Sequence, residues 1–425
     1  MTLVARTRRL GADDAAGLDL LAEAGRRGFL FEQAGDGLAG RGEVARIPLP
    51  VGDGRLRVAA DRVQEALRAV EVDHDEVGLP GTGPVAFAAL PFADESPGSV
   101  VVPRVVAGRR GDTAWVTTIV DTDDPAGGGT GDPADGHDGD WRQATSEAGW
   151  PAPTSFTVRP GRTPASWCEA VEAAVARIRG GELDKVVLAR EVVVETDHPV
   201  DVLAVLRQLR AGYPAAMLYL VDGFAGATPE LLVERVGDVV RSHPHAGTTP
   251  RTGDPVADAA RAAALFASEK DRAEHRVSID MVLDTLLAFS SYVDSEPEPS
   301  IVTLANVQHL ASMVEGRLSS PAADVLTLVA ALHPNPMICG FPAAAARKVI
   351  ADLEGFDRGR YTGAVGWVDA RGDGRFGVAI RGAELDGNRA RLFAGNGIVA
   401  DSDAATELAE TRAKLQAMLG AIVRP

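Results

Sequence analysis

Apolar residues along this chain follow two patterns, one with the spacing of a strand and one with the spacing of a helix. Short apolar runs bounded by Gly, Pro or Asp predict strands. We expect strands at residues 99–106, 113–120, 185–195, several within 215–242, and further ones at 361–368, 375–383 and 389–393, with a turn at 108–112. Helical spacing predicts helices at residues 166–179, 200–211, about 256–289 and 403–422. Gly180 and Gly181 would end the first of these helices.

The order of these elements favours a mixed α/β (α+β) fold. Predicted strands follow one another in hairpin-like runs and do not alternate strictly with helices, which favours large antiparallel sheets flanked by helices. We find no internal repeat. Residues 1–160 and 161–425 differ in character, yet we expect one intertwined structural domain. Residues 121–141 are rich in Gly, Asp and Pro and predict a mobile surface loop. A calcium loop would need the EF-hand ligand order and its closing Glu, which are missing.

Composition and charge narrow the classes of partner. The chain has 425 residues and a formal net charge of -17, without a cluster of Lys or Arg. This argues against nucleic acid or an anionic membrane as partner. The two cysteines, Cys168 and Cys339, are far apart and predict neither a disulfide framework nor a zinc site. The N-terminus has no apolar signal core, and no apolar run has membrane-spanning length. We therefore expect a cytoplasmic protein.

Two pairs of carboxylates are the first sign of chemistry. Asp271 and Glu274 are three residues apart, as are Glu407 and Glu410, so each pair would lie on one helix face. Two such faces turned towards each other would offer hard oxygen ligands suited to Mg2+. Lys414 continues the stripe of the second pair. Taken alone, each stripe has an alternative interpretation as a solvated helix face with ion pairs.

Lys185 and Glu230 are candidates for a base and an acid. Lys185 opens an apolar strand, where burial would make a neutral amine available; the alternative is a lysine that reaches water at the strand edge. Glu230 follows Pro229 at a tight turn beside apolar sequence, where a carboxyl can stay protonated and act as a general acid. The alternative for Glu230 is a surface turn residue.

The segment HPHAGTTPR contains two histidines that suggest a metal site. His243 and His245 lack a further ligand cluster, so we reject zinc. Gly247 and Thr248 are more informative, because exposed backbone N–H groups there could receive a carboxylate. Gly397, in FAGNGIV, similarly permits close backbone approach, although the dinucleotide-binding spacing of glycines is absent.

Together these segments resemble the chorismate-utilising enzymes, and among them the isochorismate synthases. The matching run covers about residues 165–422, and its motifs stand in the order that the family has. They are KVVLAR, GATPE, AGTTPR, SEKDRAEH, VQHLASMVEG, LHPNPMICGFP, YTGAVGW, AIRGAEL, AGNGIV and ELAETRAKL.

The resemblance implies a Mg2+-dependent isomerase that converts chorismate to isochorismate on a chorismate-utilising fold, with residues 161–425 as the chorismate-binding region. Lys185 would activate water for attack at ring carbon 2, and Glu230 would protonate the departing 4-hydroxyl. Glu274 and Glu407 would bind Mg2+ directly, with Asp271 and Glu410 as outer or water-mediated partners.

The resemblance also implies a set of groups for the two substrate carboxylates. Tyr361 and Arg381 would hold the enolpyruvyl carboxylate, and His309 would orient the substrate. The groups around the ring carboxylate would be Gly247, Thr248, Gly397 and Lys414. A monomer would be the family's usual state.

Two positions separate the reactions of this family. Anthranilate and aminodeoxychorismate synthases typically carry Gln at the position of Lys185, and aminodeoxychorismate synthases carry Lys at the position of Ala246. Lys185 with Ala246 therefore implies water as nucleophile. The ending of LHPNPMICGFP looks more like siderophore-type than menaquinone-type isochorismate synthases, and the downstream pathway stays open.

Three positions depart from the family's usual residues. The family more often has Thr at the position of Asn335. It more often has a small residue at the positions of Met337 and Asn396. Met337 and Asn396 are expected to narrow the cavity or alter turnover. Two alternatives to an isochorismate synthase remain: a salicylate synthase, which goes on to eliminate pyruvate, and a non-catalytic chorismate-binding protein.

Overall fold

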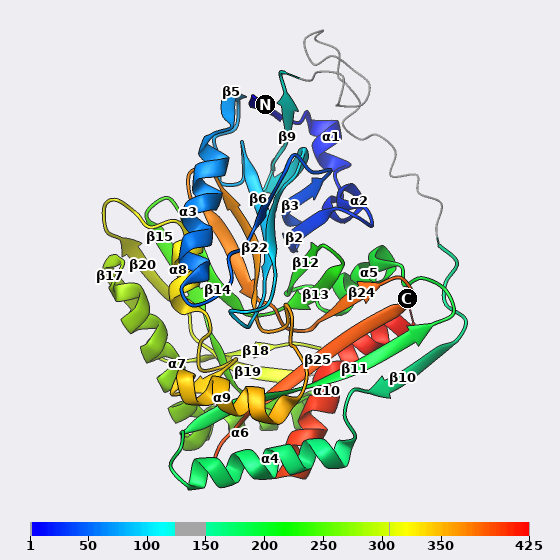
Figure 1. Ribbon diagram of the computed structural model, residues 1–425, viewed down its shortest axis with the longest axis vertical. Helices are drawn as coiled ribbons and strands as arrows, with labels where there is room; N and C mark the ends of the chain where they lie inside the picture. Colours follow the sequence, from blue (N-terminus) through cyan, green and yellow to red (C-terminus); the bar gives the residue numbers. More distant parts are fainter. Residues whose placement is uncertain (1, 124–149, 306, 425) are drawn as a thin grey trace.

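The computed structural model describes residues 2–123, 150–305 and 307–424. Within these ranges the chain forms two large sheets and one small one, with helices packed outside the large sheets (Figure 1). The expected mixed fold with large antiparallel sheets is confirmed. Most of the predicted loop at 121–141 lies outside the described residues.

The largest sheet has 13 strands and combines both ends of the chain. Its path is β10 (Phe156–Pro160), β11 (Lys185–Thr196), β25 (Arg389–Ile398), β24 (Gly382–Asp386), β13 (Phe224–Thr228), β12 (Met217–Val221), β2 (Phe29–Gln33), β3 (Asp36–Arg41), β8 (Val105–Arg110), β9 (Thr113–Asp121), β1 (Leu3–Arg9) and β5 (Glu71–Asp75), with β21 (Gly340–Phe341) paired to β11.

The second sheet has nine strands and the third has three. The nine are β17 (Ser290–Ser295), β20 (Val314–Leu318), β15 (Val239–His243), β14 (Leu231–Val236), β23 (Gly374–Val378), β22 (Ala364–Asp369), β6 (Val85–Leu90), β7 (Ser99–Val102) and β4 (Ala45–Pro48). The three are β16 (His245–Pro250), β19 (Val307–Ala311) and β18 (Ser300–Thr303).

The described chain has helices at all four predicted positions, one of them divided in two, and further helices that the sequence pattern did not predict. The helices are α1 (Ala12–Ala16), α2 (Leu20–Ala24), α3 (Arg55–Arg68), α4 (Pro164–Arg179), α5 (Val202–Gly212), α6 (Pro255–Ala267), α7 (Glu269–Leu287), α8 (Val325–Leu332), α9 (Ala343–Glu354) and α10 (Ala404–Val423). None of them, in the described chain, is both long and apolar enough to cross a membrane.

The two large sheets share a core, and strand β6 shows how the sequence builds it. All six residues of β6 are buried. Val85, Phe87 and Ala89 contribute to the core that contains residues of both large sheets, whereas the alternate residues of the strand pack in the cluster that includes α3 and α8. Because successive side chains of a strand point to opposite faces, a strand covered on both faces must be apolar throughout.

The long helix predicted at about 256–289 is instead two helices. Ser268 leaves the helical conformation, with φ -69° and ψ 112°, and its side chain accepts a hydrogen bond from Asp271 N at 3.2 Å. This is an N-cap, in which a serine oxygen satisfies a free N–H of the first turn. The break places Asp271 and Glu274 in the first two turns of α7.

The strand predicted at 99–106 is also split. Pro103 cannot donate to a ladder, and the chain passes there from β7 in the nine-stranded sheet to β8 in the large one. In both large sheets a strand from residues 1–160 pairs with a strand from residues 161–425: β2 pairs with β12, and β6 with β22.

Candidate active site

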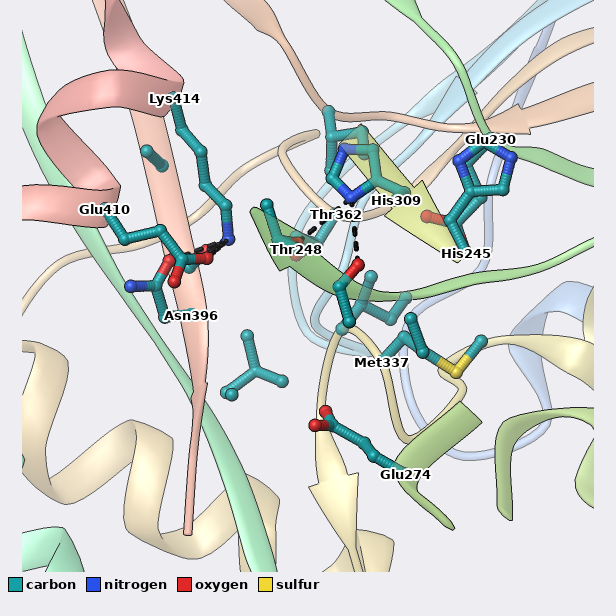
Figure 2. Close-up of a pocket in the computed structure, with 18 of the residues that line it drawn as sticks. Glu230, His245, Thr248, Glu274, His309, Met337, Thr362, Asn396, Glu410 and Lys414 are labelled. Carbon is teal, nitrogen blue, oxygen red and sulfur yellow. Dashed lines mark hydrogen bonds and ion pairs between the residues drawn. The ribbon is translucent and has the colours of Figure 1, made fainter. Parts of the chain in front are cut away.

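One cavity of about 240 Å³ lies where β11, β25, β16, α7 and α10 meet. All thirteen residues selected from the sequence as site residues line it, although they come from across 230 positions of the chain. They are Lys185, Glu230, Gly247, Thr248, Asp271, Glu274, His309, Tyr361, Arg381, Gly397, Glu407, Glu410 and Lys414. Figure 2 labels several of them, among them Glu230, Glu274 and Lys414.

Lys185 enters the cavity from the start of β11. Its ammonium contacts the Oε1 carboxylate oxygen of Glu274 on α7. Strand β11 pairs with β25 in a register that sets Val186 opposite Ile398 and places Gly397 beside the lysine. A Cβ at Gly397 would lie 2.5 Å from Lys185 Cε, so the lysine side chain needs a glycine there.

Glu230 lies between β13 and β14 and is 5% exposed. Burial raises the pKa of its carboxyl to about 8, and the backbone N–H of His245 only partly offsets this rise. At neutral pH Glu230 is therefore largely protonated, the state that a general acid requires.

Arg381 and Tyr361 border the cavity on a distorted stretch of backbone. Arg381 has φ 55° and Thr362 has φ 60°, both in the left-handed region that residues with a side chain rarely adopt. The hydroxyl of Tyr219 donates to Ile380 O at 3.1 Å and supports this stretch. Among the described residues, no carboxylate forms an ion pair with Arg381, and burial lowers its pKa, so an anion in the cavity would stabilise its charge.

The phenol of Tyr361 and the imidazole of His309 are both neutral. Burial raises the pKa of Tyr361 to about 12 and lowers that of His309 to about 3. His309 Nδ1 lies 3.0 Å from Thr248 Oγ1 and 3.4 Å from Gly247 O. Gly247, with φ 74°, forms an irregularity where β16 pairs with β19.

Three side chains of α10 enter the cavity after the Asp403 N-cap. Glu407 accepts hydrogen bonds from Ser402 Oγ at 2.8 Å and from Asn396 Nδ2 at 2.8 Å, and burial raises its pKa. Lys414 donates to Glu410 Oε1 at 2.7 Å, to Asn396 Oδ1 at 2.7 Å and to Gly395 O at 2.9 Å.

The four candidate metal ligands share the cavity but are distributed around it. Within the described ranges, no three His, Cys, Asp or Glu side chains come together closely enough to hold an ion. Glu274 and Glu410 each contact a lysine, and Glu407 contacts Ser402 and Asn396. As a donor set, carboxylate oxygens are what Mg2+ prefers, so the residues present fit that ion chemically.

Several cavity residues were missed or set aside in the sequence. Lys270, within the motif SEKDRAEH, and Ser402, outside all the motifs, line the cavity although neither was selected as a site residue. Met337 and Asn396, noted only as departures, line it as well. His245, rejected as a zinc ligand, also lines it, and both of its ring nitrogens are buried without a hydrogen-bond partner in the described chain.

Comparison with known proteins places this cavity in a family. A family model described as "Chorismate binding enzyme" matches residues 8–423. The isochorismate synthase DhbC of Bacillus subtilis is 34% identical over 396 residues, which are 91% of this chain and 91% of the relative. A putative isochorismate synthase MenF of Mycobacterium tuberculosis is 38% identical over 355 residues, 80% of this chain and 87% of the relative.

Solved structures agree with these sequence matches. The crystal structure of a putative 2,3-dihydroxybenzoate-specific isochorismate synthase, DhbC from Bacillus anthracis, superposes with a TM-score of 0.78 at 30% identity. The match covers 96% of this chain and 99% of that one. The protein therefore belongs to the family of chorismate-binding enzymes.

Proposed function

We propose that the protein is an isochorismate synthase, which converts chorismate to isochorismate. The observation that carries this proposal is a cavity bordered both by a buried, protonated carboxyl, Glu230, and by an amine, Lys185. Relatives at 34% and 38% identity over most of the chain carry that name, the second as a putative assignment.

The reaction requires a base that removes a proton from water and an acid that donates a proton to the leaving hydroxyl. Lys185, once its resting ammonium has lost a proton, acts as a neutral amine and removes a proton from water as the water oxygen bonds to ring carbon 2. The ring double bond shifts, the bond from carbon 4 to its hydroxyl breaks, and Glu230 donates the proton with which the hydroxyl leaves as water. The raised pKa of Glu230 supports the second role, because an acid must be protonated before it can donate.

Two regions of the cavity suit the two carboxylates of the substrate. Arg381, with no ion-pair partner in the described chain, and Tyr361 are proposed to bind the enolpyruvyl carboxylate. The ring carboxylate would lie against Gly247, Thr248, Gly397 and Lys414. His309 is neutral and bonded to Thr248, which suits a role in orienting the substrate.

Charge balance supports Mg2+ as the cofactor. Without substrate, the cavity contains four carboxylates and four basic side chains, which are Lys185, Lys270, Arg381 and Lys414. A substrate with two negative charges therefore needs two positive charges to accompany it, which one divalent ion supplies. Glu274 and Glu407 would hold the ion directly, with Asp271 and Glu410 as outer partners. When bound, the ion neutralises a substrate carboxylate and fixes the ring.

Product analysis tests this proposal. The purified protein, incubated with chorismate and Mg2+, should form isochorismate, and EDTA should abolish the conversion. Release of pyruvate with salicylate would identify a salicylate synthase instead, and chorismate binding without any product would identify a non-catalytic protein. We also propose a cytoplasmic monomer, which light scattering of the purified protein and fractionation of the source cells would test.

A further inference from the structure

Asn396 lies in the cavity wall between two charged side chains of α10. It belongs to β25 and is 3% exposed. Figure 2 shows its side chain close to those of Glu410 and Lys414. The motif AGNGIV resembles a family pattern that more often has a small residue at this position. The asparagine side chain is therefore a departure of this chain from that pattern.

The two ends of the Asn396 amide contact opposite charges. Its Oδ1 accepts a hydrogen bond from Lys414 Nζ at 2.7 Å, and its Nδ2 donates to Glu407 at both Oε2, 2.8 Å, and the backbone O, 2.9 Å. An ammonium only donates and a carboxylate only accepts, so this orientation of the amide is dictated by its neighbours. An alanine or glycine would provide neither bond, and a carboxylate would lack the donor.

These bonds determine which partner of Lys414 is exchangeable. An ammonium has three donors, and Lys414 uses them on Asn396, Gly395 O and Glu410. Gly395 O belongs to the backbone of β25, and Asn396 is also bonded to Glu407. Glu410, whose side chain is 34% exposed, is the partner with the fewest constraints. A carboxylate that arrives at Lys414 would therefore displace Glu410.

We propose that Asn396 is a positioning residue, which fixes Glu407 and Lys414 relative to each other before any ligand binds. Through Asn396, one side chain is presented to the divalent cation and the other to the ring carboxylate. The inference rests on the proposed function for the identity of these two ligands. Asn396 itself need not touch the reacting atoms, because it acts through its two neighbours.

Asn396→Ala tests this role, with Asn396→Ser as a second variant if the first does not fold. Outer partners of metal ligands typically contribute 10- to 100-fold to metal affinity. We expect calorimetric titration with MgCl2 alone to show affinity weaker by about that factor, and KM for chorismate to rise more than kcat falls. Asn335→Ala is the matched control: Asn335 is 2% exposed and bonds Met337 N, but contacts neither Glu407 nor Lys414. It should lower the melting temperature and leave Mg2+ affinity unchanged.

The outcomes separate this role from general packing and from the proposed function. Wild-type Mg2+ affinity and wild-type KM in a folded Asn396→Ala variant would overturn the positioning role. Equal losses of affinity in Asn396→Ala and Asn335→Ala would do the same. If the wild-type protein binds Mg2+ but does not convert chorismate, the proposed function fails, and the titration with MgCl2 still decides the role of Asn396. If the wild-type protein binds no Mg2+, both the cofactor and this role are wrong.

Discussion

The ammonium of Lys185 contacts a carboxylate oxygen of Glu274, although the two residues are 89 positions apart in the chain. The lysine side chain is 14% exposed and the glutamate 31%, so the pair is only partly screened from water. It joins the candidate base to a candidate metal ligand. Binding of a divalent cation by Glu274 would compete with the lysine for the same carboxylate.

Lys185→Ala should nearly abolish turnover. The substitution removes the proposed base and leaves Glu274 without its cation, and loss of a general base typically costs 10² to 10⁴ in rate. We expect kcat to fall by about 10³-fold in a chorismate-consumption assay. Lys348→Ala, at an exposed lysine of α9, serves as the control and should match the wild type. Full activity of Lys185→Ala would disprove the role assigned to the lysine.

Removal of Mg2+ should stop the reaction without unfolding the protein. Lys185 and Lys414 already provide cations for Glu274 and Glu410, so the metal-free cavity contains no cluster of uncompensated carboxylates in the described chain. We expect thermal melting in EDTA to stay cooperative, with a melting temperature only slightly below that in MgCl2, as expected for a ligand that stabilises by mass action. Unfolding in EDTA would instead show that the ion is structural.

Gly397→Ala should disturb Lys185 while leaving the fold intact. The added Cβ would lie 2.5 Å from Lys185 Cε and 3.1 Å from Nζ, so the lysine must move. We expect a loss of kcat of at least ten-fold, on the order of one lost hydrogen bond to a charged group, with near-normal far-UV circular dichroism. The control is Gly420→Ala on α10, where a new Cβ meets no atom within 4 Å outside its own helix. That variant should keep its activity and gain up to about 1 kcal/mol of stability.

The pKa of Glu230, raised to about 8, predicts that both activity and stability decrease as pH rises. Activity should fall as pH rises through about 8, because the acid then loses its proton. Stability should fall as pH rises from the ordinary pKa of 4.5 to about 8, because in that range the unfolded chain releases a proton that the folded protein retains.

Glu230→Gln separates these effects from those of other groups. The variant should be nearly inactive, and its stability in urea, compared with the wild type, should improve more at pH 8 than at pH 5. Glu65→Gln, at an exposed residue of α3, should change neither property. If the variant's gain in unfolding free energy over the wild type is the same at pH 5 and at pH 8, Glu230 titrates normally.

A buried ion pair anchors the strand that carries Lys185. Arg358 contacts Glu354, with both side chains 2% exposed, and also donates to Val187 O at 2.7 Å and Ile338 O at 2.9 Å. Arg358→Met leaves a buried carboxylate unpaired and should cost about 3–5 kcal/mol in urea unfolding. Arg177→Met, which breaks a more exposed pair with Asp352, should cost at most about 1 kcal/mol. Similar losses of unfolding free energy in the two variants would contradict this distinction between a buried and an exposed ion pair.

Much of the fold could be predicted because the local signals are strong. The apolar strand from Lys185, the helix ended by Gly180 and the final helix all lie where spacing placed them. The break at Ser268 had a local signal too, a serine three residues before Asp271, which is typical of an N-cap. The pairing of β2 with β12 had no local sequence signal, since it depends on packing between distant segments.

The site was predictable from the resemblance, and less so from the residues alone. Nothing local connects Glu230 to Lys185, because the register of β11 on β25 and the position of β14 bring them together. Asn396 was visible as a departure from the family's motif. Its bonds to Glu407 and Lys414 depend on how β25 lies against α10, which the sequence does not specify.

The division of both large sheets between the two parts of the chain has a consequence for inheritance. Strands β2 and β6, from the first 160 residues, pair with β12 and β22 of the remainder, so each large sheet gains an open edge when either part is missing. A gene fragment that encodes residues 161–425 would contain every proposed catalytic residue and still yield open sheet edges prone to aggregation. Recombination at that boundary therefore cannot donate this chemistry to another protein as a ready-made module.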